Sequence, residues 1–126
     1  TDVVFLANGF LVHQAMQAAE RLSAHGVSAR VVDVHTVKPL DREDVLRHAL
    51  QTGAVVTCEE HQLTGGLGSA VCEALSEGCC VPVERIGIRD SFGESGRPEE
   101  LIEKYGLGIE ALCQAALRAV QRKKAK

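Results

Sequence analysis

The residues most suited to chemistry lie near the middle of the chain, where the mostly apolar run Ala54–Cys58 ends in Glu59, Glu60 and His61. A carboxylate beside an imidazole can take part in general acid–base catalysis. Adjacent residues on a strand point to opposite faces, however, so Glu59 and Glu60 do not form a facing pair by themselves. Three interpretations stay open: a catalytic group, polar contacts at an interface or a cap for nearby N–H groups, and simple exposure to solvent. The second is favoured.

A glycine-rich turn follows, with Gly65, Gly66 and Gly68 just before a helical pattern of apolar residues. N–H groups at the start of a helix attract anions, so the turn could hold a phosphate. In the dinucleotide-binding template that begins at Gly66, the third glycine falls at the position of Val71, and no Walker-type lysine is present. A tight turn that lets the helix pack close to the sheet is the other interpretation.

A second polar stretch, Arg89–Arg97, is long for a link between a strand and a helix and is dense in charge. It contains Arg89, Asp90 and Phe92. An aromatic side chain in such a loop packs either onto its own domain or onto a partner, and the sequence does not decide between the two. These three residues join Glu59 and its neighbours as candidates for contacts with other domains.

The sequence lacks the spacings that are typical of metal ligands and of catalytic nucleophiles. The histidines lack His-x-x-x-His spacing and the five cysteines lack Cys-x-x-Cys spacing, so we predict no metal site. Ser69 lacks the Gly-x-Ser-x-Gly frame of a hydrolase. An odd number of cysteines suits reduced thiols in the cytoplasm better than a disulfide framework.

The net charge of the chain and the length of its apolar runs limit the classes of partner. The 126 residues carry a formal net charge of -3, which argues against nucleic acid or an anionic membrane as the main partner. No apolar run approaches the ~20 residues that span a bilayer, and no signal peptide is visible. The chain begins at Thr1 without Met, so we expect a piece of a longer polypeptide.

Strand and helix patterns alternate along the chain, which predicts an α/β domain whose mostly parallel sheet is covered on both faces. We expect one domain over residues 1–121 and a frayed basic tail over residues 122–126. The expected strands are Val3–Ala7, Ser28–Val34, Ala54–Cys58 and Val81–Ile88; the expected helices run from Leu11 to His25, from Asp41 to Gly53, from the glycine turn to about Glu77, from Pro98 to Gly106, and over Ile109–Val120.

Taken in order, the motifs resemble those of the C-terminal domain of transketolase-like thiamine diphosphate enzymes. The matching pieces are Val37–Asp41, Thr57–His61, Gly65–Val71, Ile86–Gly93, Glu99–Leu101 and Lys104–Leu107. The resemblance implies a three-layer α/β/α fold with a mostly parallel sheet of about five strands, one of them antiparallel. Deoxyxylulose-phosphate synthases and 2-oxo acid dehydrogenase subunits share this domain, but Gly93–Gly96 looks closest to the transketolase pattern.

In this family the cofactor, thiamine diphosphate with magnesium, lies between a diphosphate-binding and a pyrimidine-binding domain that precede this one. The resemblance therefore implies no catalytic, cofactor-binding or metal residue in this chain. It implies a structural and assembly domain, inactive alone, of an enzyme that transfers a two-carbon ketol unit between sugar phosphates. The two preceding domains would lie on the same or a separate chain of a homodimeric parent. An alternative is a free-standing α/β module that binds a nucleotide or another anion at Gly65–Ser69. The candidates for domain contacts are Glu59, Glu60, His61, Gly65, Gly66, Gly68, Arg89, Asp90 and Phe92.

Overall fold

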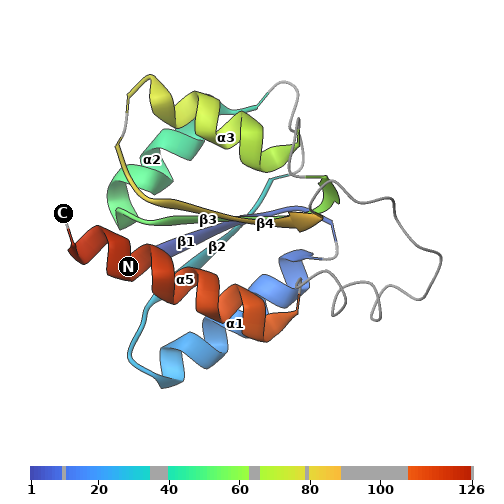
Figure 1. Cartoon of the computed structure of the whole chain (residues 1–126), viewed down its shortest axis with the longest axis vertical. Helices are drawn as coiled ribbons and strands as arrows, with labels where there is room; N and C mark the ends of the chain where they lie inside the picture. The colour runs from blue at the N-terminus through green and yellow to red at the C-terminus, as the bar shows by residue number, and fades with distance from the viewer. Residues whose placement is uncertain (10, 35–39, 63–65, 79, 89–107, 126) are drawn as a thin grey trace.

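A computed structural model of the chain describes residues 1–9, 11–34, 40–62, 66–78, 80–88 and 108–125. Its strands form one parallel sheet in the order β2-β1-β3-β4. Helices α2 and α3 cover one face of the sheet, and α1 and α5 cover the other (Figure 1). The strands are β1 (Val3–Ala7), β2 (Ala29–Asp33), β3 (Val55–Gln62) and β4 (Val83–Ile88); the helices are α1 (Leu11–Ala24), α2 (Arg42–Thr52), α3 (Leu67–Ser76) and α5 (Ile109–Lys124).

The central strand β1 explains why the sheet has two cores. All five of its side chains are buried, and they alternate between the faces as a strand requires. Val3 and Phe5 pack with residues of α1 and α5, whereas Val4 and Leu6 pack with residues of α2 and α3. The continuous apolar run predicted a strand buried on both faces, and the structure confirms it.

Helix boundaries follow local signals in the sequence. The carboxylate of Asp41 accepts a hydrogen bond from the backbone N–H of Asp44 at 3.1 Å, so Asp41 caps the start of α2 as predicted. The same helix ends at Gly53, whose φ of 77° lies in the left-handed region that glycine adopts readily. Of the helices in the described part of the chain, none is long and apolar enough to cross a membrane.

Two predicted boundaries are wrong. Strand β3 does not end at Cys58 but continues through Glu59 to Gln62, because Gln62 pairs again with β4 after an irregularity in the ladder. The last helix does not end at Val120, because α5 extends to Lys124. Lys123 Nζ donates to the carbonyl oxygens of Asp2 and Thr52, both at 2.8 Å, and so fastens this end of α5 to the rest of the domain.

The three-layer α/β/α class is confirmed, with a correction to the strand count. The described residues contain four strands, all parallel, which are the four that periodicity predicts. The fifth, antiparallel strand implied by the family resemblance is not among them. The helix expected to begin at Pro98 lies outside the described residues.

Candidate functional site

Glu59 is a buried carboxylate that caps a helix from a neighbouring strand. It lies on β3 with no exposed surface. One carboxylate oxygen accepts the backbone N–H of Leu67 at 2.8 Å, and the other accepts that of Gly68 at 2.6 Å. Gly66, the residue before α3, provides no side-chain cap. Glu59 therefore satisfies two N–H groups that lack partners within the helix, and its negative charge lies at the positive end of the helix dipole.

Two other side chains, those of Thr57 and Arg85, approach the first turn of α3 near Glu59. A Cβ atom added to Gly68 would lie 2.6 Å from Arg85 Nε and 3.1 Å from Thr57 Oγ1, so only glycine fits this position without a shift. Arg85, on β4, also donates from an Nη atom to Ser69 Oγ at 2.9 Å. We call Thr57, Glu59, Gly68, Ser69 and Arg85 the Glu59 cluster; it joins β3, β4 and α3.

This geometry favours the capping interpretation of Glu59 over the catalytic one. Both carboxylate oxygens are engaged and the side chain has no contact with solvent. Cys58, the preceding residue, is also buried. Burial, and to a lesser extent the Glu59 charge, raises the pKa of its thiol above the usual range, so the thiol stays protonated and is a poor nucleophile. Within the described ranges, no group of three or more His, Cys, Asp or Glu residues could hold a metal ion.

The predicted contact residues fall into three groups. Glu59 and Gly68 are buried within the domain, and Gly66 is half-buried at the start of α3. Glu60 and His61 lie on β3, but their side chains are outside the described residues. Gly65, Arg89, Asp90 and Phe92 lie outside the described residues altogether. Contacts of all these candidates with other domains therefore stay a prediction.

Sequence reasoning missed Thr57 and Arg85. The two residues are 28 positions apart by their numbers, yet they are partners in the register of β3 and β4. The only signal in the sequence is a pair of charged residues, Glu84 and Arg85, inside a run of strand-forming residues at Val83–Ile88. That signal does not identify the partner, because the register of parallel strands depends on contacts between distant segments.

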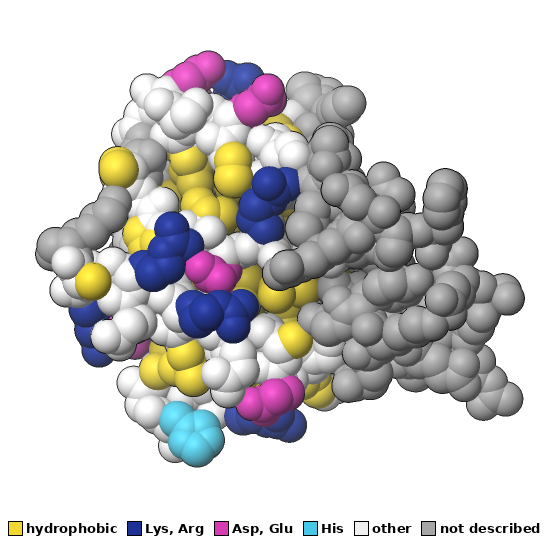
Figure 2. All heavy atoms as spheres, viewed as in Figure 1, with side chains coloured by type: hydrophobic (Ala, Val, Ile, Leu, Met, Phe, Trp, Pro, Cys, Tyr) yellow, Lys and Arg dark blue, Asp and Glu magenta, His cyan; other side chains and the backbone are white. Residues whose placement is uncertain are grey.

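A second carboxylate lies nearer the surface on the adjacent strand. Glu84, on β4, accepts hydrogen bonds from Arg118 Nε at 2.9 Å and from an Nη atom of Arg122 at 2.6 Å, both on α5. Burial alone would raise the pKa of Glu84, but the two guanidinium groups outweigh it and the pKa is lowered. Figure 2 shows acidic, basic and apolar side chains interspersed on the face seen in Figure 1.

The anion-binding alternative fails at the glycine turn. The N–H groups of Leu67 and Gly68, at the start of the helix that would bind the anion, are already occupied by Glu59. The glycine at position 68 instead allows the close approach of Arg85 to the helix. This is the tight-turn interpretation, in which glycine serves packing between helix and sheet.

Known proteins resemble this chain over most of its length. Residues 1–112 match the family model for the transketolase C-terminal domain. The chain is 51% identical over 122 residues to 6-deoxy-6-sulfo-D-fructose transketolase subunit SqwH of Clostridium sp. (strain MSTE9), and 46% identical over 128 residues to 1-deoxy-D-xylulose-5-phosphate synthase of Pelotomaculum thermopropionicum. These matches cover 97% and 98% of the chain but only 38% and 20% of the two relatives.

A solved structure described as a split-gene transketolase in an inactive beta4 tetramer is similar over 97% of this chain and 40% of its own. Its TM-score is 0.91 and its sequence identity 48%. The chain thus spans well under half the length of each of these three proteins. None of the three comparisons supports a free-standing nucleotide-binding module.

Proposed function

Because the chain belongs to the transketolase C-terminal domain family, we propose that it is the assembly domain of an enzyme that moves a two-carbon ketol unit between sugar phosphates. The observation that carries the proposal is the match along nearly the whole chain to subunits named as transketolases. The relative named as a deoxyxylulose-phosphate synthase has the same domain, so the choice of sugars would depend on other parts of the parent enzyme.

The parent enzyme would use thiamine diphosphate with magnesium, but the start of α3 in this chain does not suit the diphosphate. A diphosphate needs exposed donors or cations, and the N–H groups of Leu67 and Gly68 are bonded to Glu59 in the protein interior. No described cluster of acidic side chains suits magnesium either. The diphosphate-binding and pyrimidine-binding domains of the parent would hold the cofactor, on the same polypeptide or on a separate one.

The contacts with those domains would lie at the carboxyl ends of the strands, where open parallel sheets meet ligands and partners. Glu60 and His61 stand near the carboxyl end of β3, and Arg89, Asp90 and Phe92 follow the end of β4 in the sequence. In the proposal these residues contribute to assembly of a cytoplasmic homodimeric parent, and Glu59 holds the start of α3 against β3.

His61→Ala and Phe92→Ala in the parent enzyme test this assignment. We expect each substitution to raise the dissociation constant of the parent assembly at least about tenfold, the scale of a residue at the centre of an interface. Turnover measured at a protein concentration that restores full assembly should stay within about twofold. Sedimentation velocity and steady-state kinetics give the two quantities.

The matched control is His25→Ala, because His25 is an exposed residue just after α1 and far in sequence from both candidates. Unchanged assembly in both interface variants would count against the proposal. A loss of turnover that persists in the fully assembled variants would indicate a direct role in chemistry instead.

A further inference from the structure

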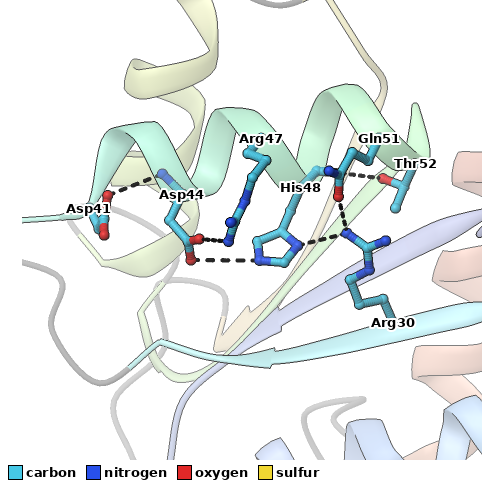
Figure 3. A network of polar contacts seen from close by, with 7 residues as sticks. All are labelled: Arg30, Asp41, Asp44, Arg47, His48, Gln51 and Thr52. Atoms are coloured by element: carbon cyan, nitrogen blue, oxygen red, sulfur yellow. Dashed lines mark hydrogen bonds and ion pairs between the residues drawn. The ribbon is translucent and has the colours of Figure 1, made fainter.

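A second polar network joins α2 to β2, which is an edge strand of the described sheet (Figure 3). An Nη atom of Arg30, on β2, lies 2.9 Å from His48 Nδ1, on α2. The same Nη atom donates to Gln51 Oε1 at 2.6 Å. The other ring nitrogen, His48 Nε2, lies 3.6 Å from Asp44 Oδ2 one turn earlier on the helix. The imidazole therefore lies between a cation of the sheet and an anion of its own helix.

The chemistry of arginine fixes the protonation state of His48 in this network. A guanidinium group has only donors, so Nδ1 of His48 must accept the hydrogen bond from Arg30. The ring is then neutral, with its one proton on Nε2, which faces the carboxylate of Asp44. A protonated imidazole would present N–H groups on both sides, and one of them would face the donors of Arg30.

The surroundings of the ring, taken together, also favour its neutral form. The His48 side chain is 14% exposed, and this burial is the largest cause that lowers its pKa below 6.5. Asp44 raises the pKa, whereas Arg30 and Arg47 lower it. Asp44 also forms an ion pair with Arg47, so its negative charge is shared with another cation. The net effect is a pKa below the ordinary value, and it agrees with the neutral tautomer that the geometry requires.

We propose that Arg30 and His48 form an acid-sensitive latch between β2 and α2, closed while the imidazole is neutral. When the pH falls, a proton from solvent adds to the lone pair of Nδ1, and the hydrogen bond from Arg30 to that nitrogen breaks. Arg30 keeps its bond to Gln51, and α2 keeps its apolar contacts through Val45 and Ala49. The latch therefore loosens the junction of α2 with the edge of the sheet without unfolding the helix.

NMR of the imidazole nitrogens in the native chain tests the latch, with His48→Gln used to assign its signals. We expect the Nε2–H tautomer at neutral pH and a pKa below 6.5. Arg30→Met, which keeps a similar stem but has no donor, should raise that pKa. Asp44→Asn should lower it further. His25→Gln is the matched control: it removes an exposed histidine and should leave the His48 titration unchanged.

An Nδ1–H tautomer, a pKa at or above 6.5, or a titration unaffected by Arg30→Met would overturn the proposal. The tautomer is read in the unmodified chain, so the test remains decisive if a variant fails to fold. Denaturant unfolding supplies a second measurement. Because the folded pKa lies below the unfolded one, the latch contributes stability that is full above about pH 6.5 and is lost as pH falls through the folded pKa.

Acidification should raise the unfolding equilibrium constant of the native chain. The rise should be about tenfold for each pH unit that separates the pKa of His48 in the folded state from its pKa in the unfolded state. His48→Gln should lack this component, whereas His25→Gln should keep it. Equal acid sensitivity in all three proteins would also overturn the latch.

Discussion

Two glutamates on adjacent strands, Glu59 on β3 and Glu84 on β4, show how differently one carboxylate can be accommodated. Glu59 has no exposed surface and is bonded to two backbone N–H groups of α3. The side chain of Glu84 is 18% exposed and is bonded to Arg118 and Arg122 of α5. Backbone N–H groups take the place of water around the carboxylate of Glu59. Around Glu84, two arginine side chains take the place of part of the water.

The difference matters because the hydrogen-bond donors around the two glutamates do not have the same access to water when the carboxylate is removed. The N–H groups of Leu67 and Gly68 are fixed in the first helical turn and have no acceptor within the helix. Without Glu59 they stay buried and unsatisfied. Arg118 and Arg122 are exposed and can return to water if Glu84 is lost. We therefore expect the same substitution to have a large effect at Glu59 and a small one at Glu84.

Glu59→Gln is expected to give the largest effect. The amide keeps the size of the side chain but has one acceptor oxygen, so at least one N–H group at the start of α3 loses its partner. We expect the free energy of unfolding to fall by about 2–4 kcal/mol, measured by urea denaturation near neutral pH. A loss no larger than that of Glu84→Gln would show that burial and backbone bonding do not distinguish the two sites.

Gly68→Ala tests the packing of the Glu59 cluster without changing any charge. The new methyl group would meet Arg85 Nε at 2.6 Å and Thr57 Oγ1 at 3.1 Å, so Arg85 must move away from the helix. We expect a loss of about 1–3 kcal/mol in the free energy of unfolding, by the same denaturation experiment.

Gly78→Ala is the matched control for this substitution. A Cβ atom at Gly78 meets only Leu46 atoms, at 3.7 and 3.8 Å, which is ordinary contact. The control should therefore change stability by less than about 0.5 kcal/mol. Equal effects at the two glycines would mean that the close approach of Arg85 to α3 is not tight in solution.

The contrast between these regions also separates what the sequence could predict from what it could not. Strand β1 and the ends of α2 follow from neighbouring residues: an apolar run, Asp41 before a helix and Gly53 after it. The anion at the start of α3 comes from a residue eight positions away on another element. The glycine turn suggested an anion site, and a cap for nearby N–H groups was one interpretation of Glu59 and its neighbours, but the sequence did not connect the two.

The misjudged end of β3 has a related cause. Glu59, Glu60 and His61 are polar and precede a glycine turn, which are signals of a loop. Strand β4 nevertheless pairs with β3 as far as Gln62, and these contacts between distant segments override the local preference. The family resemblance identified the fold without locating this pairing, so the Glu59 cluster became visible only in three dimensions.

Apart from the control at Gly78, the smallest expected effect is that of Glu84→Gln, about 0.2–1 kcal/mol at neutral pH, because exposed ion pairs are weak. The pH dependence makes this small effect distinctive. The pKa of Glu84 is lowered in the folded protein, so its contribution is present above about pH 4.5 and is lost as pH falls through the folded pKa. Urea denaturation of both proteins should therefore show a difference near pH 7 that shrinks with added salt and disappears once the pH lies below the folded pKa of Glu84. A difference that persists in acid would mean that Glu84 acts through packing against α5 rather than through the charges of Arg118 and Arg122.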